Sequence, residues 1–140
     1  MPLERNIKRD TGGASAIEFA IVAPVFIMIV LTMIGYGIYL SAAHAVQQLT
    51  SDAARSAVAG ITATERSQLA RDYISAEAGR YSFIDTTAMA VKVDDDPDNP
   101  SQFTVTISYD AAGLPIWNLY GFAMPDEHIT RFATIRLGGL

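Results

Sequence analysis

The chain has 140 residues, of which 50% are hydrophobic, and a formal net charge of −5 at pH 7. This length suits one modest domain, and the excess of acidic residues argues against nucleic-acid binding, which depends on clustered lysine and arginine. The chain has no cysteine, which excludes disulfide bonds and thiolate metal sites.

A long apolar segment lies near the N-terminus. Residues 19–43 contain no Asp, Glu, Lys or Arg, and about 20 apolar residues suffice to cross a bilayer as a helix. We therefore expect a membrane helix over residues 14–40. It is preceded by Arg5, Lys8 and Arg9, and basic residues that flank a membrane segment tend to stay in the cytoplasm. The N-terminal tail is therefore expected inside the cytoplasm and the rest of the chain outside it.

The helical pattern continues past the membrane segment. Small apolar residues recur at helical spacings, which predicts a narrow amphipathic stripe. Residues 14–59 are therefore expected to form one long helix, bent by Pro24 and stopped near Gly60. The stripe consists of Ala43, Val46, Ala53, Ala54, Ala57 and Val58.

A second helix is predicted directly after Gly60. Thr62 and Glu65 form the S/T-x-x-E pattern of a capping box, and Gly79 is a candidate for the helix end. The expected apolar face of this helix consists of Leu69, Ala70, Tyr73 and Ile74.

Three strands are predicted to complete the fold. Apolar and polar residues alternate over residues 89–93 and again over 103–109, and the residues between them, 94–101, are typical of a turn. A third alternation follows over residues 129–137. We expect an α+β fold, in which residues 41–140 form an extracytoplasmic domain with a small antiparallel sheet packed on the lower part of the long helix.

Signals for enzymatic chemistry are weak. His44 and His128 are far apart, and neither belongs to a metal-ligand pattern. The sequence has no nucleophile, phosphate-binding or dinucleotide motif. The acidic residues from Asp94 to Asn99 lack the glycine and glutamate of an EF-hand loop, and favour a solvated turn. We therefore expect no catalytic residues, no cofactor and no metal site. An exported enzyme with its site in residues 111–128 is the remaining enzymatic alternative.

An aromatic group lies in the same connection. Trp117, Tyr120 and Phe122 either cover one side of the small sheet or form a patch that contacts a partner or the membrane interface. Because amphipathic aromatic side chains suit both positions, the sequence leaves both interpretations open.

One acidic residue stands at the start of the apolar segment. The stretch reads GASAIEFAIVAPVFIMIVL, in which Gly13 is followed by four residues and then by Glu18 and Phe19. This arrangement resembles the processing site of type IV prepilins and, more narrowly, the TadE-like family of the tight-adherence (Flp) pilus system. The segments DAARSAVAG (52–60) and ITRFATIRL (129–137) fit the general layout of that family.

The resemblance implies a minor pilin or pseudopilin. In that family a membrane prepilin peptidase cleaves after the glycine, which places the cut between Gly13 and Ala14 and makes residues 1–13 a leader. The family's hallmark glutamate corresponds to Glu18, and the aromatic residue after it to Phe19. The resemblance further implies an inner-membrane precursor with a periplasmic domain, whose helix packs with other pilins or pseudopilins.

The cost of placing a charge in lipid explains why such a glutamate needs a partner. A carboxylate in hydrocarbon is strongly unfavourable unless it is paired. Cleavage would create an ammonium group at Ala14, four positions from Glu18 and on nearly the same helix face. Glu18 would then pair with its own amine or with the amine of a neighbouring subunit. The alternative is that it extends to the cytoplasmic headgroups.

Two other interpretations of the N-terminal segment stay open. The sequence AHA at 43–45 is similar to a signal-peptidase site, although the apolar segment is longer than the roughly 7–15 residues of a secretory signal. The other interpretation is a single-pass anchor for a periplasmic binding or scaffold protein with no pilus role.

Overall fold

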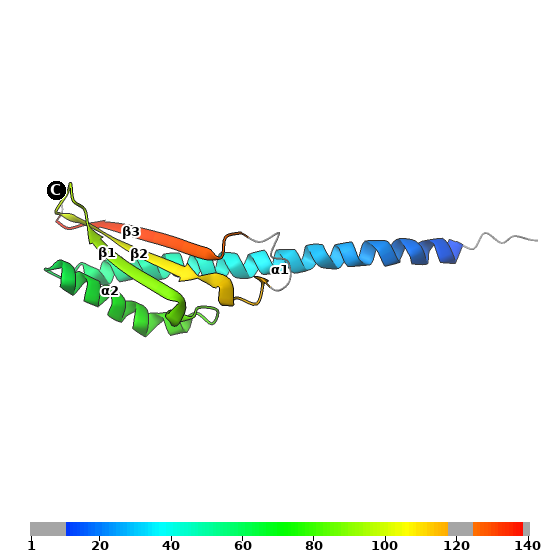
Figure 1. The fold of residues 1–140 in the computed structure, drawn as a ribbon, viewed down its shortest axis with the longest axis horizontal. Coiled ribbons are helices and arrows are strands. Elements are labelled where there is room, and N and C mark those ends of the chain that lie inside the picture. Colours follow the sequence, from blue (N-terminus) through cyan, green and yellow to red (C-terminus); the bar gives the residue numbers. More distant parts are fainter. Residues whose placement is uncertain (1–10, 118–124, 139–140) are drawn as a thin grey trace, which may run out of the picture.

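The computed structural model describes residues 11–117 and 125–138, which form two α-helices and a three-stranded sheet (Figure 1). In chain order the elements are α1 (Thr11–Ala57), α2 (Ala63–Glu77), η1 (Ala78–Arg80), η2 (Thr86–Ala88), β1 (Met89–Asp95), β2 (Gln102–Asp110), η3 (Ala111–Gly113) and β3 (His128–Arg136). The η elements are short 3-10 helices. The predicted α+β fold, with a long N-terminal helix, a second helix and a small antiparallel sheet, is confirmed.

α1 is a single helix of 47 residues that continues through Pro24. At about 1.5 Å per residue it is roughly 70 Å long, and Figure 1 shows one rod with the other elements gathered around its C-terminal half. It ends at Ala57, before the predicted end at residue 59. Val58 therefore lies outside the helix and is 45% exposed, so its predicted place in the buried stripe is wrong.

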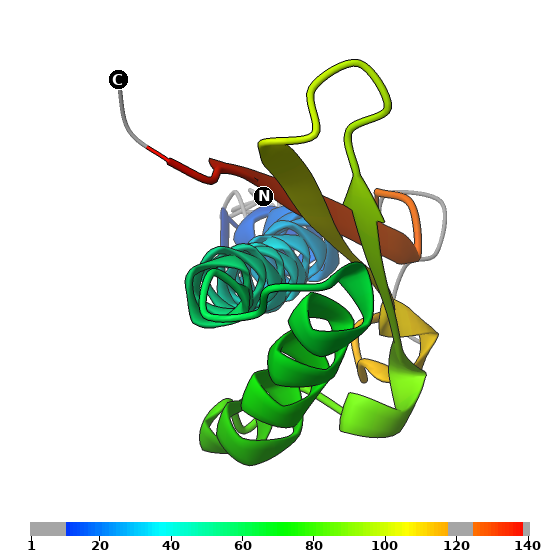
Figure 2. The ribbon, with the colours of Figure 1, turned by 90° about the vertical axis from the view of Figure 1, so that its left-hand side faces the viewer.

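The two halves of α1 have different surroundings. None of residues 12–34 is buried, whereas Ala42, Val46, Leu49 and Ala53 are almost completely buried. Figure 2 shows α1 and α2 side by side against one face of the sheet. Small side chains on the buried stripe let these neighbours approach the helix backbone, because the distance between packed helices depends on the side chains at the contact.

The sheet is antiparallel throughout, in the order β1-β2-β3. Side chains of the central strand β2 alternate between the helix layer and the outer face, and Phe103, Val105 and Ile107 are fully buried. On the outer face the Oγ1 atoms of Thr104 and Thr134 lie 2.8 Å apart and join β2 to β3. One face of the sheet therefore belongs to the core, and the other is polar.

The acidic turn is shorter than predicted. Asp94 and Asp95 continue β1 in register with β2, and the chain reverses only after them. This extension brings the Asp95 carboxylate to Arg66 of α2, an interaction that a turn at this position would not allow. Asp96 stabilises the turn itself, because its Oδ1 accepts a hydrogen bond of 2.9 Å from the backbone N–H of Asp98.

Neither glycine that was predicted to end a helix has the left-handed backbone of a glycine cap. Among the described glycines, Gly138 has a positive φ, of 85°. α1 instead ends in a turn in which the N–H of Gly60 donates to the carbonyl of Ala57 over 3.0 Å. α2 ends at Glu77 and passes directly into η1, which contains Gly79.

α2 begins at the predicted capping box. The Thr62 hydroxyl accepts a hydrogen bond of 3.2 Å from the Glu65 N–H. In return the Glu65 carboxylate accepts from the N–H groups of Ile61, at 2.8 Å, and Thr62, at 3.1 Å. These bonds satisfy backbone donors that have no partner within the helix.

Replacing the capping hydroxyl is expected to weaken the fold. Thr62→Ala should lower the free energy of unfolding by about 1 kcal/mol, because the hydroxyl of an N-cap residue is lost. Urea unfolding of the full chain in detergent measures this through the fluorescence of Trp117, the one tryptophan of the sequence. Thr64→Ala, an exposed change in the same turn, should leave the midpoint within error; equal midpoints for both variants would contradict the capping role.

Because the Glu65 carboxylate caps α2, we expect the stability of the fold to depend on pH. The backbone N–H groups of Thr62 and then Ile61 hold the pKa of Glu65 below its ordinary value of 4.5. A folded-state pKa below the unfolded one stabilises the fold above the unfolded value, and this contribution is lost as the pH falls through the folded pKa. The difference in unfolding free energy between the native chain and Glu65→Ala should therefore shrink as the pH is lowered below about 4.5. A constant difference between pH 3 and pH 7 would contradict this.

Candidate functional site

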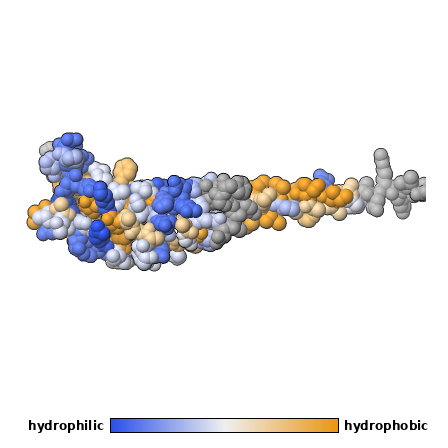
Figure 3. Space-filling view, in the orientation of Figure 1, coloured by the Kyte–Doolittle hydropathy of each residue, from blue (hydrophilic) through white to orange (hydrophobic). Residues whose placement is uncertain are grey.

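The N-terminal half of α1 is an uncovered apolar surface. The helix Gly12–Ala57 is long and apolar enough to cross a membrane, and none of its most apolar window, of mean hydropathy 2.6, is buried. Figure 3 shows this half of the rod as a nearly continuous hydrophobic surface, in contrast to the mixed surface of the folded part. Its large exposed side chains include Ile17, Phe19, Ile21, Val22, Phe26, Ile27, Met33 and Ile34.

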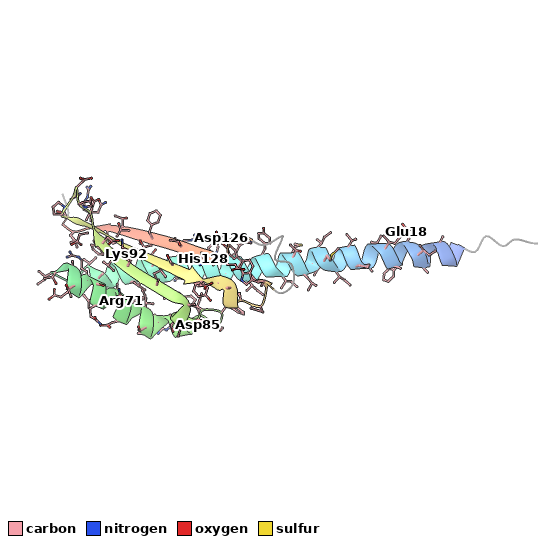
Figure 4. All side chains as sticks on the ribbon, in the orientation of Figure 1. Glu18, Arg71, Asp85, Lys92, Asp126 and His128 are labelled. Carbon is pink, nitrogen blue, oxygen red and sulfur yellow. The ribbon has the colours of Figure 1, made fainter. Side chains whose placement is uncertain are left out.

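Glu18 lies on this surface near the start of the helix (Figure 4). Its side chain is exposed, and together with Ser15, Phe19 and Val22 it lines a shallow hollow on one side of the helix. Residue 14 lies four positions before it in the same helix, so the two positions share a helix face. A new amine at residue 14 would therefore form within reach of this carboxylate.

The glycine before this segment is not required by the fold. A Cβ atom added to Gly13 would meet no atom within 4 Å, and the backbone there has no positive φ. Gly13 is also exposed and lies inside α1, where glycine costs stability relative to alanine. A glycine that neither packing nor backbone geometry demands is consistent with a requirement outside the folded chain.

One known protein family contains sequences similar to this segment. Residues 13–55 match the model of the TadE-like protein family. This segment is TadE-like. The match starts at Gly13, extends through the apolar helix and ends within the buried part of α1. The resemblance suggested by the sequence is thereby confirmed for this segment. No curated protein and no solved structure matches the chain significantly.

An aromatic contact lies where the TadE-like segment enters the folded domain. The rings of Tyr39 and Trp117 meet edge to face, with centroids 6.4 Å apart, and the Trp117 indole N–H donates to the carbonyl of Ala111. Trp117 thus contacts α1 and belongs to the rim of the core that α1 shares with the sheet. Tyr120 and Phe122, which were grouped with it in the sequence, lie outside the described residues.

The residues considered for enzymatic chemistry do not form a shared site. His44 is on the exposed side of α1, whereas the Nδ1 atom of His128 lies 3.5 Å from the Oδ1 atom of Asp126, with both side chains exposed. Within residues 11–117 and 125–138, no group of three potential metal ligands comes together. Figure 4 shows His128 and Asp126 at the start of β3.

A hollow beside the 111–128 connection is lined by carboxylates that already accept hydrogen bonds from neighbouring turns. It has a volume of about 360 Å³ and is lined in part by Asp85, Asp110 and Tyr109. Asp85 caps η2, and the side chain and backbone of Thr87 lower its pKa. Asp110 caps η3, and the Tyr109 hydroxyl donates to the carbonyl of Phe83 over 3.2 Å. These groups therefore fix local turns.

An ion pair between the buried Arg66 and the exposed Asp95 was not predicted from the sequence. Arg66 is 6% exposed, and its Nη2 atom lies 2.7 and 2.8 Å from the two carboxylate oxygens of Asp95. Its Nη1 atom donates to the carbonyls of Gly60, at 3.3 Å, and Ile61, at 3.1 Å, and the guanidinium lies 5.4 Å from the centre of the Phe103 ring. Arg66 thus connects the end of α1, the start of α2 and the end of β1.

Proposed function

We propose that this chain is a minor pilin or pseudopilin of a tight-adherence pilus system. Its precursor would lie in the inner membrane, and a prepilin peptidase would cleave it between Gly13 and Ala14. The observation that carries the proposal is the TadE-like segment itself: an uncovered apolar helix that starts at a glycine without a packing role and continues into a folded domain. The role is structural, without a reaction of its own.

The proposed topology follows from the charges around the helix. Basic residues precede the apolar segment, at Arg5, Lys8 and Arg9, and favour a cytoplasmic N-terminus. The domain around the C-terminal half of α1 would then lie in the periplasm. Removal of residues 1–13 would leave the apolar helix at the N-terminus, where it can pack with the corresponding helices of other pilins or pseudopilins.

Glu18 has a defined part in this proposal. In a bundle of apolar helices its carboxylate is unfavourable unless a cation meets it, and the amine created at Ala14 supplies that cation. Pairing with the amine of a neighbouring subunit would fix the axial position of one helix against the next, while the apolar faces pack. Pairing within one chain would only neutralise the charge.

The structure makes cleavage after AHA a poor alternative. Ala43 and Ala45 are 2% and 7% exposed within the continuous helix α1. A cut at this point would remove the part of α1 that carries Ala42 and Ala43 from the core. This supports prepilin processing over a secretory signal.

The decisive experiment is to determine the N-terminus of the chain in membranes with and without a co-expressed prepilin peptidase. Mass spectrometry should find Ala14 as the first residue only when the peptidase is present, and Gly13→Lys should abolish this product. Gly12→Ala is the matched control and should be processed normally. A chain that begins at Val46 would indicate a secretory signal, and one that keeps Met1 with active peptidase would indicate a plain anchor; either result overturns the proposal.

Removing the Glu18 carboxylate is expected to impair assembly but not processing. Glu18→Ala should still be cleaved after Gly13, but its recovery in complexes with other pilus subunits should fall at least about tenfold, as expected for the loss of a buried charge pair. Thr32→Ala is the matched control, because the Thr32 hydroxyl only donates to the carbonyl of Met28 in its own helix, over 2.8 Å. Normal assembly of the Glu18→Ala chain would refute the pairing role.

A further inference from the structure

The two edge strands of the sheet, β1 and β3, differ in whether side chains of the same chain bind their outward backbone groups. At β1 the N–H of Asp96 donates to the carbonyl of Gln102, so the alternation of an antiparallel pair directs the backbone groups of the odd-numbered β1 residues away from β2. α2 covers this edge: the Arg71 guanidinium donates to the outward carbonyl of Val91 over 3.1 Å, and Arg66 binds Asp95.

The backbone of β3 is directed outward at the opposite edge. The N–H of Leu137 donates to the carbonyl of Ser101, and the N–H of Ala111 donates to the carbonyl of Glu127. These bonds mark the two ends of the β2–β3 ladder and place the odd-numbered β3 residues in hydrogen-bonded pairs with β2. The N–H and C=O groups of the even-numbered residues therefore point away from the sheet.

Within the part of the chain that the structure describes, this edge is almost unpaired. The outward carbonyl of Thr130 accepts from Arg131 Nη1 over 2.8 Å, and the outward groups of Phe132 and Thr134 have no partner there. The register from Gln102↔Arg136 to Asp110↔His128 is unbroken, so no bulge protects the strand. Natural sheets commonly block such an edge, because it is a template for another strand.

The side chains of β3 show which kind of strand would fit. Phe132 is 67% exposed on the outer face. Arg131 holds its guanidinium at the outward carbonyl of Thr130, and the exposed Arg136 ends the strand. Neither arginine has a carboxylate partner among the described residues. By contrast, four other basic side chains of this acidic chain form ion pairs with carboxylates: Arg55, Arg66, Arg80 and Lys92.

A second copy of the chain does not fit this edge by antiparallel pairing. β3 crosses α1 obliquely but extends mainly in the direction of the helix axis (Figures 1 and 2). Antiparallel pairing of two β3 strands would therefore point the two apolar helices in opposite directions, which two chains anchored in one membrane cannot do. It would also bring two copies of the same basic strand together.

We propose that β3 is a docking edge for an extended acidic segment of a partner protein, which adds to the sheet as a fourth strand. Backbone hydrogen bonds to residues 130, 132 and 134 would supply most of the affinity, as in other cases of strand addition. Carboxylates of the partner would meet Arg131 and Arg136, and an apolar side chain would cover Phe132. The proposal does not depend on cleavage after Gly13.

The test uses the full chain in detergent and two synthetic probes. One probe is a capped peptide of alternating valine and threonine with glutamate at both ends, and the other has lysine in place of glutamate. Backbone hydrogen exchange should show that the glutamate peptide slows exchange at Thr130, Phe132 and Thr134. It should bind roughly tenfold more tightly than the lysine peptide, as expected when two cross-strand charge pairs change sign.

Two sets of variants distinguish the contribution of backbone hydrogen bonds to peptide binding from the contribution of charged side chains. Thr134→Pro removes an outward N–H without removing a bond to β2, which an edge strand tolerates, and it should abolish binding; Thr134→Ala loses the same hydroxyl but should bind normally. Arg131→Glu combined with Arg136→Glu should reverse the preference to the lysine peptide, whereas Lys92→Glu on β1 should not.

Three outcomes would overturn the proposal. The first is exchange at the even-numbered β3 residues that the glutamate peptide does not change. The second is equal binding of both peptides to the native chain. The third is protection of these residues that appears without peptide and grows with protein concentration, because a second copy of the chain would then occupy the edge.

Discussion

Gly60→Ala is expected to lower the free energy of unfolding by roughly 3 kcal/mol, the upper end of what overpacking a well-packed site costs. A Cβ atom at this position would lie 2.6 Å from the backbone nitrogen of Arg66 and 3.0 Å from its Cα atom. Backbone atoms cannot move aside as the end of a flexible side chain can. The start of α2 would therefore have to shift away from the end of α1, and the hydrogen bonds from Arg66 to the carbonyls of Gly60 and Ile61 would be strained.

The measurement is urea unfolding of the full chain in detergent, followed by Trp117 fluorescence. Gly79→Ala is the matched control, because a Cβ atom there meets nothing within 4 Å and the φ angle is not positive. Its midpoint should stay the same or rise slightly, since alanine restricts the unfolded chain. If both variants had the same midpoint, the close approach of Gly60 to Arg66 would not limit stability.

Asp95→Ala is expected to lower the free energy of unfolding by about 2–3 kcal/mol, because it leaves a buried charge without its partner. The Arg66 side chain is 7% exposed, and its Nε atom has no hydrogen-bond partner within the described structure. Because the guanidinium is largely buried, water can compensate for the lost carboxylate only in part. The Asp95 side chain is 40% exposed, which keeps the expected loss below that of a fully enclosed pair.

Two further variants show whether the loss comes from the charge. Asp52→Ala breaks the exposed pair with Arg55, whose side chain is 73% exposed, and should change stability by at most about 0.5 kcal/mol. Arg66→Met in the Asp95→Ala background should recover part of the stability, since an apolar side chain then fills the buried position. No recovery in the double variant would mean that the hydrogen bonds to Gly60 and Ile61, and not the unpaired charge, account for the effect.

Local patterns in the sequence predict most of the fold because they act over short distances. The capping box at Thr62, the alternation in β2 and the small-residue stripe in α1 all need only neighbours within one turn or one strand. The predicted ends were less accurate, because long-range contacts decide them. β1 continues to Asp95 because β2 and Arg66 offer partners there.

In the candidate site, too, local sequence patterns predict some residues, whereas long-range contacts determine others. Gly13, Glu18 and Phe19 belong to one continuous motif and are visible in the sequence, as is the family match that starts at Gly13. The Arg66–Asp95 pair joins residues 29 positions apart, and no periodicity relates them. The open edge of β3 was also hidden, because which strand is at an edge, and what covers it, depends on the order of the strands and on the position of α2.

Because α1 is one uninterrupted helix, it connects the membrane segment rigidly to the folded domain. The helix crosses from the uncovered half to the packed half without a linker, so a tilt of the membrane segment is transmitted in full to the domain. Over a packed half of roughly 35 Å, a tilt of about 20° would displace the far end sideways by about 12 Å. The one residue that weakens the helix ladder, Pro24, lies far from the domain. Bending there would turn the first helical turns around Glu18 against the lipid, while the domain and the rest of the helix move as one body.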